Sequence, residues 1–246
     1  MAHRPITVSG VEVTPLCDAV GPMGAALRRP LGEMFLGSGL QDEPWILHFH
    51  CYLIRDAAGR LTLVDTGIGG EDSPAASWAP VPGTLPGELA AVGVTPAEIG
   101  TVVLTHLHSD HSSGVVTGGR PAFENARYVV QQAELDAARG AVLDTLLPPI
   151  KDQLHAVEGD AEVSPGVHVH LAPGHTPGHQ IARVGEVAMV GDLLHHPVQL
   201  DDPAIRYVYD DDPETSARTR AEVLEALKAE GAILAPAHFG EPFLRL

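Results

Sequence analysis

The sequence predicts an α/β protein in which two β-sheets pack face to face and helices cover their outer faces. Strand-like and helix-like segments alternate in blocks along the 246 residues, in the order strand-rich, helical, strand-rich, helical. The chain shows no internal repeat and no linker-like change of composition. We therefore expect one domain that covers residues 1–246.

Each expected element rests on a local pattern of apolar residues that ends at turn or cap residues. Strands are expected over 8–13, 45–55, 60–65, 101–105, 127–130, 167–171, 180–184, 186–190 and 232–235, with hairpin chemistry at 56–59. Helices are expected over 84–94, 132–139, 142–157 with a break at Pro148-Pro149, and 213–230 between an Asp212 N-cap and a Gly231 C-cap. Thr95-Pro96-Ala97-Glu98 opens a short helical turn.

The segment from Ala19 to Pro44 is Gly-rich and carries several apolar residues. A loop of this length inside a compact domain is usually functional or disordered. We expect a flap over a site, and a helix packed on the core is the alternative. Trp78 or Phe239 is expected to help shape an apolar pocket beneath the flap.

The charge balance argues against polyanionic partners. The 32 acidic and 15 basic residues give a net charge of −17, and no Lys/Arg run is longer than Arg28-Arg29. We expect no nucleic-acid partner and no membrane partner, and a small-molecule substrate instead. The N-terminus lacks a secretory pattern, and no apolar run approaches the roughly 18 residues of a membrane span. A cytoplasmic protein is expected, with Cys17 and Cys51 as reduced thiols.

Histidine is the residue type in excess, with 14 copies, and neutral imidazole is the commonest side-chain metal ligand. The predicted strand at 101–105 runs into a segment with His106, His108, Asp110 and His111. In extended chain His106 and His108 point to the same side, and the other two follow where the chain turns. Four metal-binding side chains within six positions predict a metal site at the end of a buried strand.

Three further residues of metal-binding type follow predicted strands. His175 lies in Pro173-Gly174-His175-Thr176-Pro177-Gly178-His179, Asp192 follows Gly191, and His238 ends Pro236-Ala237-His238. A lone histidine at a strand end is more often hydrogen-bonded than metal-bound. Together with the first cluster, however, these residues favour one metal centre built from several strand ends.

The motifs HxHxDH, PGHTPGH, GD and PAH, in this order, resemble those of the metallo-β-lactamase superfamily over essentially the whole chain. The resemblance implies an αββα sandwich with a two-metal site at one edge. All seven positions of the family's metal ligands are matched: His106, His108 and His175 for the first metal, Asp110, His111 and His238 for the second, and Asp192 as the bridging carboxylate. Asp65 matches an aspartate that supports the site, and His179 is expected to be structural.

The stretch after Asp192 resembles the branch that contains methyl parathion hydrolase and lactonase-like hydrolases. In the acyl-homoserine lactonases, the third residue after the bridging Asp is a Tyr that contacts the substrate carbonyl, and here it is His195. We expect His195 to polarise the scissile carbonyl or to protonate the leaving oxygen, and a loop histidine is the alternative. Asp110 is the second expected catalytic residue, which orients the nucleophile and passes its proton on.

The resemblance implies a dinuclear metal-dependent hydrolase of small esters or lactones, in which a hydroxide bridging two metals is the nucleophile. Two Zn²⁺ ions are expected, and a His/Asp ligand set without Cys also suits Fe, Mn or Co. The alternatives are a mononuclear iron enzyme resembling persulfide dioxygenases, a hydrolase of amide or phosphotriester bonds, and a non-catalytic metal-binding protein. A homodimer is compatible with the family, although no sequence feature decides it.

Overall fold

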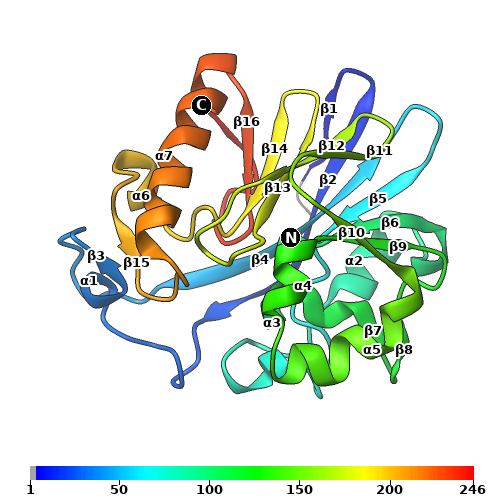
Figure 1. Cartoon of the computed structure of the whole chain (residues 1–246), viewed down its shortest axis with the longest axis horizontal. Coiled ribbons are helices and arrows are strands. Elements are labelled where there is room, and N and C mark those ends of the chain that lie inside the picture. The colour runs from blue at the N-terminus through cyan, green and yellow to red at the C-terminus, as the bar shows by residue number, and fades with distance from the viewer. Residues whose placement is uncertain (1–3) are drawn as a thin grey trace.

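Two large β-sheets lie face to face in the computed structural model, which describes residues 4–246 (Figure 1). The first sheet contains, in spatial order, β1 (Ile6–Val8), β2 (Val11–Pro22), β4 (Ile46–Arg55), β5 (Leu61–Val64), β6 (Ile99–Val103), β9 (Arg127–Gln131) and β10 (Leu154–Val157). The second contains β11 (Ala161–Ser164), β12 (Val167–Leu171), β13 (Gln180–Val184), β14 (Val187–Gly191), β16 (Ile233–Pro236) and β17 (Leu244–Arg245). Two short pairs join β3 (Phe35–Leu36) to β15 (Arg206–Tyr207) and β7 (Val116–Thr117) to β8 (Arg120–Pro121).

Helices cover the outer faces of both sheets (Figure 1). The α-helices are α1 (Leu31–Met34), α2 (Leu85–Ala91), α3 (Ser109–Ser112), α4 (Gln132–Ala137), α5 (Leu147–Ile150), α6 (Val198–Asp201) and α7 (Pro213–Glu230). Single turns of other helix types occur at η1 (Pro74–Ser77), η2 (Pro96–Glu98), η3 (Ser113–Val115), η4 (Val142–Leu146) and η5 (Lys151–Gln153). None of the helices in residues 4–246 combines the length and apolarity that a bilayer crossing requires.

Strand alternation divides the core between the layers, because successive side chains of a strand point to opposite faces. On β4, Leu53 packs with the helix-facing cluster that contains Leu89 of α2, whereas Tyr52 and Ile54 pack between the sheets. The outer face of the second sheet packs against Leu224 of α7 and its neighbours. The predicted αββα layering is thereby confirmed.

Most predicted elements are present, and α7 begins and ends as expected. The Asp212 carboxylate accepts a hydrogen bond from the Thr215 backbone N–H, and Gly231 ends the helix with a left-handed φ of 64°. Two predictions are wrong. The strand expected over 8–13 is a hairpin, because Ser9 and Gly10 adopt φ of 50° and 79° and turn the chain between β1 and β2.

The second wrong prediction is the end of the helix over 142–157, together with its break. Residues 142–153 are helical, as η4, α5 and η5 in succession. Pro148 lies in the first turn of α5, where a missing N–H costs nothing, so the two prolines do not break the helical path. The end of the predicted helix, 154–157, is strand β10, which pairs in parallel with β9. Strand–strand hydrogen bonds with a distant partner override the local pattern here.

The segment at 19–44 has structure of its own. Its first residues extend β2 to Pro22, and α1 and β3 follow, with β3 paired to β15. Met23, Met34 and Phe35 of the segment are buried in an apolar cluster with Tyr207. The segment is therefore packed against the chain near β15, and it covers part of the pocket described below.

Candidate metal centre

The ends of four strands bring the predicted metal ligands to one edge of the sandwich. Strands β5, β6 and β9 are parallel, and β14 is parallel to β16, so these carboxyl ends meet. The HxHxDH segment follows β6, Asp192 follows β14, and His238 follows β16. His175 lies in the loop after β12. Every one of the seven predicted ligands is at this edge.

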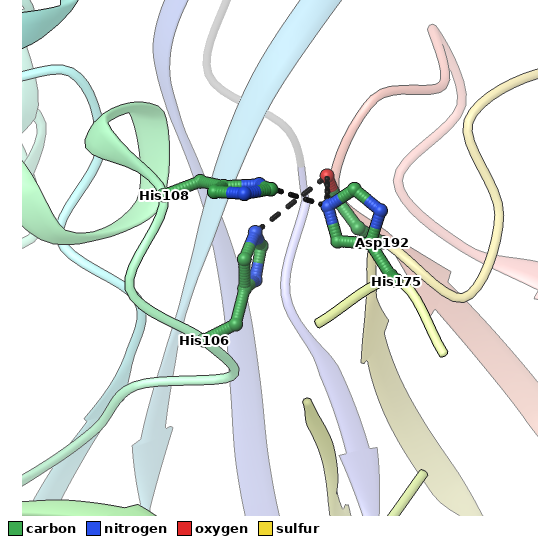
Figure 2. Close-up of side chains that lie close together, drawn as sticks. All are labelled: His106, His108, His175 and Asp192. Carbon is green, nitrogen blue, oxygen red and sulfur yellow. Dashed lines mark hydrogen bonds and ion pairs between the residues drawn. The ribbon is translucent and has the colours of Figure 1, made fainter. Parts of the chain in front are cut away.

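The seven side chains form two adjoining groups that share Asp192. One group is His106, His108, His175 and Asp192, and the other is Asp110, His111, Asp192 and His238. Within each group the ligand atoms lie within 4.8 Å of one another. Figure 2 shows the first group, in which three imidazoles from two loops converge on the Asp192 carboxylate.

Asp192 divides its two oxygens between the groups. Its Oδ2 lies 3.1 Å from His175 Nε2 and 3.8 Å from His106 Nε2, whereas its Oδ1 lies 3.0 Å from His111 Nε2 and 3.1 Å from His238 Nε2. A carboxylate can bind one cation through each of its oxygens when each oxygen faces a different ligand group. The geometry of Asp192 meets this condition.

The buried donor atoms at this centre fit two metal ions. His106 Nε2, His111 Nε2 and Asp192 Oδ1 are buried and make no hydrogen bond within the described residues. His111 Nε2 and Asp192 Oδ1 approach each other to 3.0 Å without hydrogen-bond geometry, as two ligands of one cation would. Leaving such atoms unsatisfied costs about 1–3 kcal/mol each, which cations at the two groups would offset.

The electrostatics of the centre separate its histidines into two kinds. Burial lowers the pKa of His108 to about 3, and His175 adds to this effect. Burial also disfavours the charged form of His175, but the carboxylates of Asp192 and Asp210 outweigh it and raise the pKa to about 10. The pKa of Asp192 is well below its usual value because the surrounding imidazoles overcome the effect of burial. The centre thus holds an ionised carboxylate that attracts cations.

Buried oxygen acceptors bind the Nδ1 atoms of three of the histidine rings, on the side away from the centre. His111 Nδ1 donates to Asp65 Oδ2 (2.9 Å), His175 Nδ1 donates to Asp210 Oδ1 (2.9 Å), and His238 Nδ1 donates to the His48 carbonyl oxygen (2.8 Å). Each bond leaves Nε2 directed at the centre. Such partners fix the tautomer and orientation of ligating histidines. The expected supporting contact of Asp65 is present.

A buried glutamate joins the two loops that carry histidines. Glu134 Oε1 accepts from the Leu107 N–H (2.9 Å), and Oε2 accepts from the Gly178 N–H (3.0 Å). A Cβ at Gly178 would lie 2.3 Å from the Glu134 backbone nitrogen, so only glycine permits this approach. Glu134 therefore sets the distance between the HxHxDH loop and the loop of His175.

His179 makes structural contacts, as expected. Its Nδ1 donates to the Ala172 carbonyl oxygen (3.0 Å), and its Nε2 accepts from the Asp192 N–H (3.1 Å). His195 is nearer to the centre: its Nε2 donates to Asp192 Oδ2 (3.0 Å), and its ring packs on Tyr207 at 3.9 Å between centroids. His195 Nδ1 is buried without a hydrogen bond in the described structure.

A pocket of about 250 Å³ opens directly over the centre. Its floor is formed by His108, Asp110, His175, Asp192, His195 and His238. Its apolar walls come from Met23, Leu27, Leu47 and Trp78, with Tyr207 and Tyr209 opposite. Met23 and Leu27 belong to the segment expected as a flap, and Trp78 lines the pocket as predicted. Phe239 does not, because it is buried in the cluster under α7.

The sequence did not predict the roles of Asp210, which holds His175, and of Arg220, which pairs with Asp210. The oxygen of Asp210 that does not bind His175 lies 3.5 Å from Arg220 Nη2, and both side chains are fully buried. Arg220 also donates to the carbonyl oxygens of Leu193, Pro203 and Ile205. The available signal was Arg220 on the apolar face of a predicted helix, where an arginine needs buried partners.

The chain belongs to the metallo-beta-lactamase superfamily, whose family model matches residues 50–238. An N-acyl homoserine lactonase of Bacillus thuringiensis is 31% identical over 156 residues, which are 59% of this chain and 58% of that protein. One from Bacillus sp is 40% identical over 95 residues, 37% of this chain and 35% of that protein. The chain thus spans about a third to three fifths of the curated relatives it matches.

Solved structures match over nearly the whole fold. A quorum-quenching N-acyl homoserine lactone lactonase has a TM-score of 0.72 and 26% identity, with 96% of this chain and 94% of that chain covered. The dizinc quorum-quenching lactonase AidC has a TM-score of 0.80 and 22% identity over 99% and 93%, a likeness of fold.

Proposed function

We propose that the protein is a dinuclear metal-dependent hydrolase that opens small lactones, with two Zn²⁺ ions as its cofactor. The observation that carries the proposal is the Asp192 carboxylate, which gives one oxygen to each of two complete ligand groups at the floor of a pocket. The lactonase names of the relatives support the choice of bond. A mononuclear iron enzyme would not need the second group of Asp110, His111 and His238.

The proposed chemistry divides between the metals and the chain. When bound, two dications supply a water-derived nucleophile at neutral pH and polarise the scissile carbonyl. Asp110 lies at the pocket floor with Oδ2 3.2 Å from His111 Nε2. In our proposal this carboxylate orients the nucleophile, takes its proton and returns it to the leaving alkoxide of the opened ring.

The walls favour a neutral substrate with an apolar arm. Met23, Leu27, Leu47 and Trp78 offer apolar surface, and no Lys or Arg among residues 4–246 lines the pocket. The net charge of −17 repels polyanions. An acyl chain against these walls excludes water and positions the ring over Asp192 and Asp110. We therefore place acyl-substituted lactones ahead of phosphotriesters and charged esters.

Metal removal gives the direct test of this function. Zinc-loaded protein is expected to release one proton per lactone opened, measured with a pH indicator, and chelator-stripped protein is expected to lose at least about 10²-fold of the rate. Aryl esters, thioesters and phosphotriesters serve as matched substrates. Release on phosphotriesters alone, or full activity after metal removal, would contradict the proposal.

We propose that His195 donates a hydrogen bond to the scissile carbonyl through its Nε2–H, which turns to the bound lactone from Asp192 Oδ2, its acceptor in this structure at 3.0 Å. His195→Phe keeps the ring contact with Tyr207 but has no donor, so kcat is expected to fall about 10²-fold. His195→Gln keeps a hydrogen-bond donor, so its kcat is expected to fall less than that of His195→Phe. His196→Phe is the matched control, because His196 does not line the pocket. Unchanged kcat in His195→Phe, with full metal content, would remove His195 from catalysis.

A further inference from the structure

A second cluster of metal-binding side chains lies outside the centre described above. Cys17 on β2 and His48 and His50 on β4 offer three ligand atoms that lie within 4.8 Å of one another. Cys17 pairs directly with His50 in the strand register, and a bulge follows between Cys17 and Ala19. His48 and His50 are two residues apart on one strand, so both rings lie on the same face, stacked at 5.3 Å.

The separation of the Cys17 and His48 ligand atoms suits a tetrahedral metal ion. Cys17 Sγ lies 3.5 Å from His48 Nδ1. Metal–sulfur and metal–nitrogen bonds of about 2.3 and 2.0–2.1 Å at a tetrahedral angle place the two atoms about 3.6 Å apart. The remaining ligand atom, from His50, lies within 4.8 Å of both.

The orientation of His50 also suits a ligand. Its Nε2 lies 2.9 Å from the Phe239 carbonyl oxygen, which can only accept, so Nε2 carries the proton. In the neutral ring the lone pair is then on Nδ1. A backbone carbonyl behind a histidine is the arrangement that holds ligating imidazoles in place. His50 therefore has the support that a metal ligand requires.

We propose that Cys17, His48 and His50 form a further metal site, separate from the His/Asp centre, for a thiophilic divalent ion such as Zn²⁺. The Cys17 thiol releases its proton to solvent as the metal–sulfur bond forms, and no oxidant or reductant is needed. Cys17 and His48 are partly exposed, so an ion reaches the cluster from solvent. Water completes the fourth position.

The charge around the cluster favours a cation. Burial is the largest cause that raises the pKa of the Cys17 thiol, and the carboxylates of Glu88 and Asp18 raise it further. The same negative charge attracts a divalent ion, which in turn stabilises the thiolate.

The site is joined to the His/Asp centre through the backbone of β4. The His48 carbonyl oxygen that holds His238 Nδ1 belongs to a residue of the new cluster. The ring of Phe49, between His48 and His50, contacts the ring of His238 at 5.3 Å. Metal binding at Cys17, His48 and His50 is therefore expected to change the surroundings of His238.

Cobalt titration of the metal-free protein tests the site by a signal that the His/Asp centre cannot produce. A thiolate bound to Co²⁺ gives a near-ultraviolet charge-transfer band, and the seven residues of that centre include no cysteine. We expect the band to grow as up to three equivalents of Co²⁺ are added, to a limit of one thiolate-bound ion per chain, and to be absent in Cys17→Ser. Cys51→Ala is the matched control, because Cys51 is buried among apolar residues such as Leu16 and Leu53. It is expected to keep the band.

A second variant and a second measurement guard against misfolding. His48→Gln, made at a partly exposed residue, is expected to remove the band while circular dichroism stays unchanged. In the unmodified chain, Zn²⁺ is expected to slow alkylation of Cys17 by iodoacetamide at least tenfold. Saturation of the protein with Co²⁺ without the band, a band that survives Cys17→Ser, or alkylation that zinc does not slow would each overturn the proposal.

Discussion

Asp192→Asn is expected to lower kcat/KM for the best lactone by about 10³-fold and to release at least one of the two metals. The carboxylate oxygens of Asp192 face four imidazoles of the two ligand groups, each at a distance of 3.0–3.8 Å. Asparagine removes the negative charge and turns one oxygen into an N–H donor, which cannot bind a cation. One of the two ligand groups therefore loses the carboxylate oxygen that Asp192 contributes to it.

The measurement combines metal content per chain with the rate of proton release. Asp201→Asn is the matched control, because Asp201 is an exposed aspartate of α6 outside the pocket. It is expected to keep both metals and the full rate. A variant Asp192→Asn that holds two metals and stays within tenfold of the unaltered rate would mean that Asp192 does not bridge.

The predicted ligands could be found from the sequence because each lies in the segment that follows a strand. His106 to His111 follow β6, and Asp192 and His238 follow β14 and β16 within one or two residues. Parallel strands bring such ends to one edge whatever the intervening loops do. The local sequence therefore predicts where these side chains lie, and all seven are close together in the structure.

The residues that hold the ligands could not be found in this way. Glu134 bonds to chain segments 27 and 44 residues away, and Asp210 bonds to His175 across 35 residues. No periodicity connects such partners, since the folded path alone brings them together. The same limit explains β10, whose strand character depends on pairing with β9. The packing of 19–44 depends likewise on contacts with β15.

Arg220→Met is expected to destabilise the protein by about 3–5 kcal/mol, the cost of leaving a buried charge without its partner. Arg220 is fully buried, and its guanidinium donates to the carbonyl oxygens of Leu193 (2.7 Å), Pro203 (2.9 Å) and Ile205 (2.7 Å). Methionine fills much of the same volume but satisfies none of these acceptors. Asp210 would then keep a buried negative charge faced only by His175.

Thermal unfolding measures this loss, which corresponds to a fall in Tm of about 6–20 °C for a chain of this size. Arg218→Met, on the exposed side of the same helix, is the matched control and is expected to change Tm by less than about 2 °C. Arg220→Lys keeps the charge but not the planar set of donors, so an intermediate Tm is expected.

Arg220→Met also tests whether the contact between Asp210 and His175 contributes to metal affinity. Without Arg220, Asp210 is free to turn from His175 Nδ1, and metal affinity of the folded protein is expected to fall about 10–100-fold. Competition with a chelator measures this at a temperature where the variant is folded. If Tm falls while metal affinity is unchanged, Arg220 stabilises the loop before α7 without positioning His175. If both fall, the chain His175–Asp210–Arg220 acts as one unit that ties the metal centre to the core under α7.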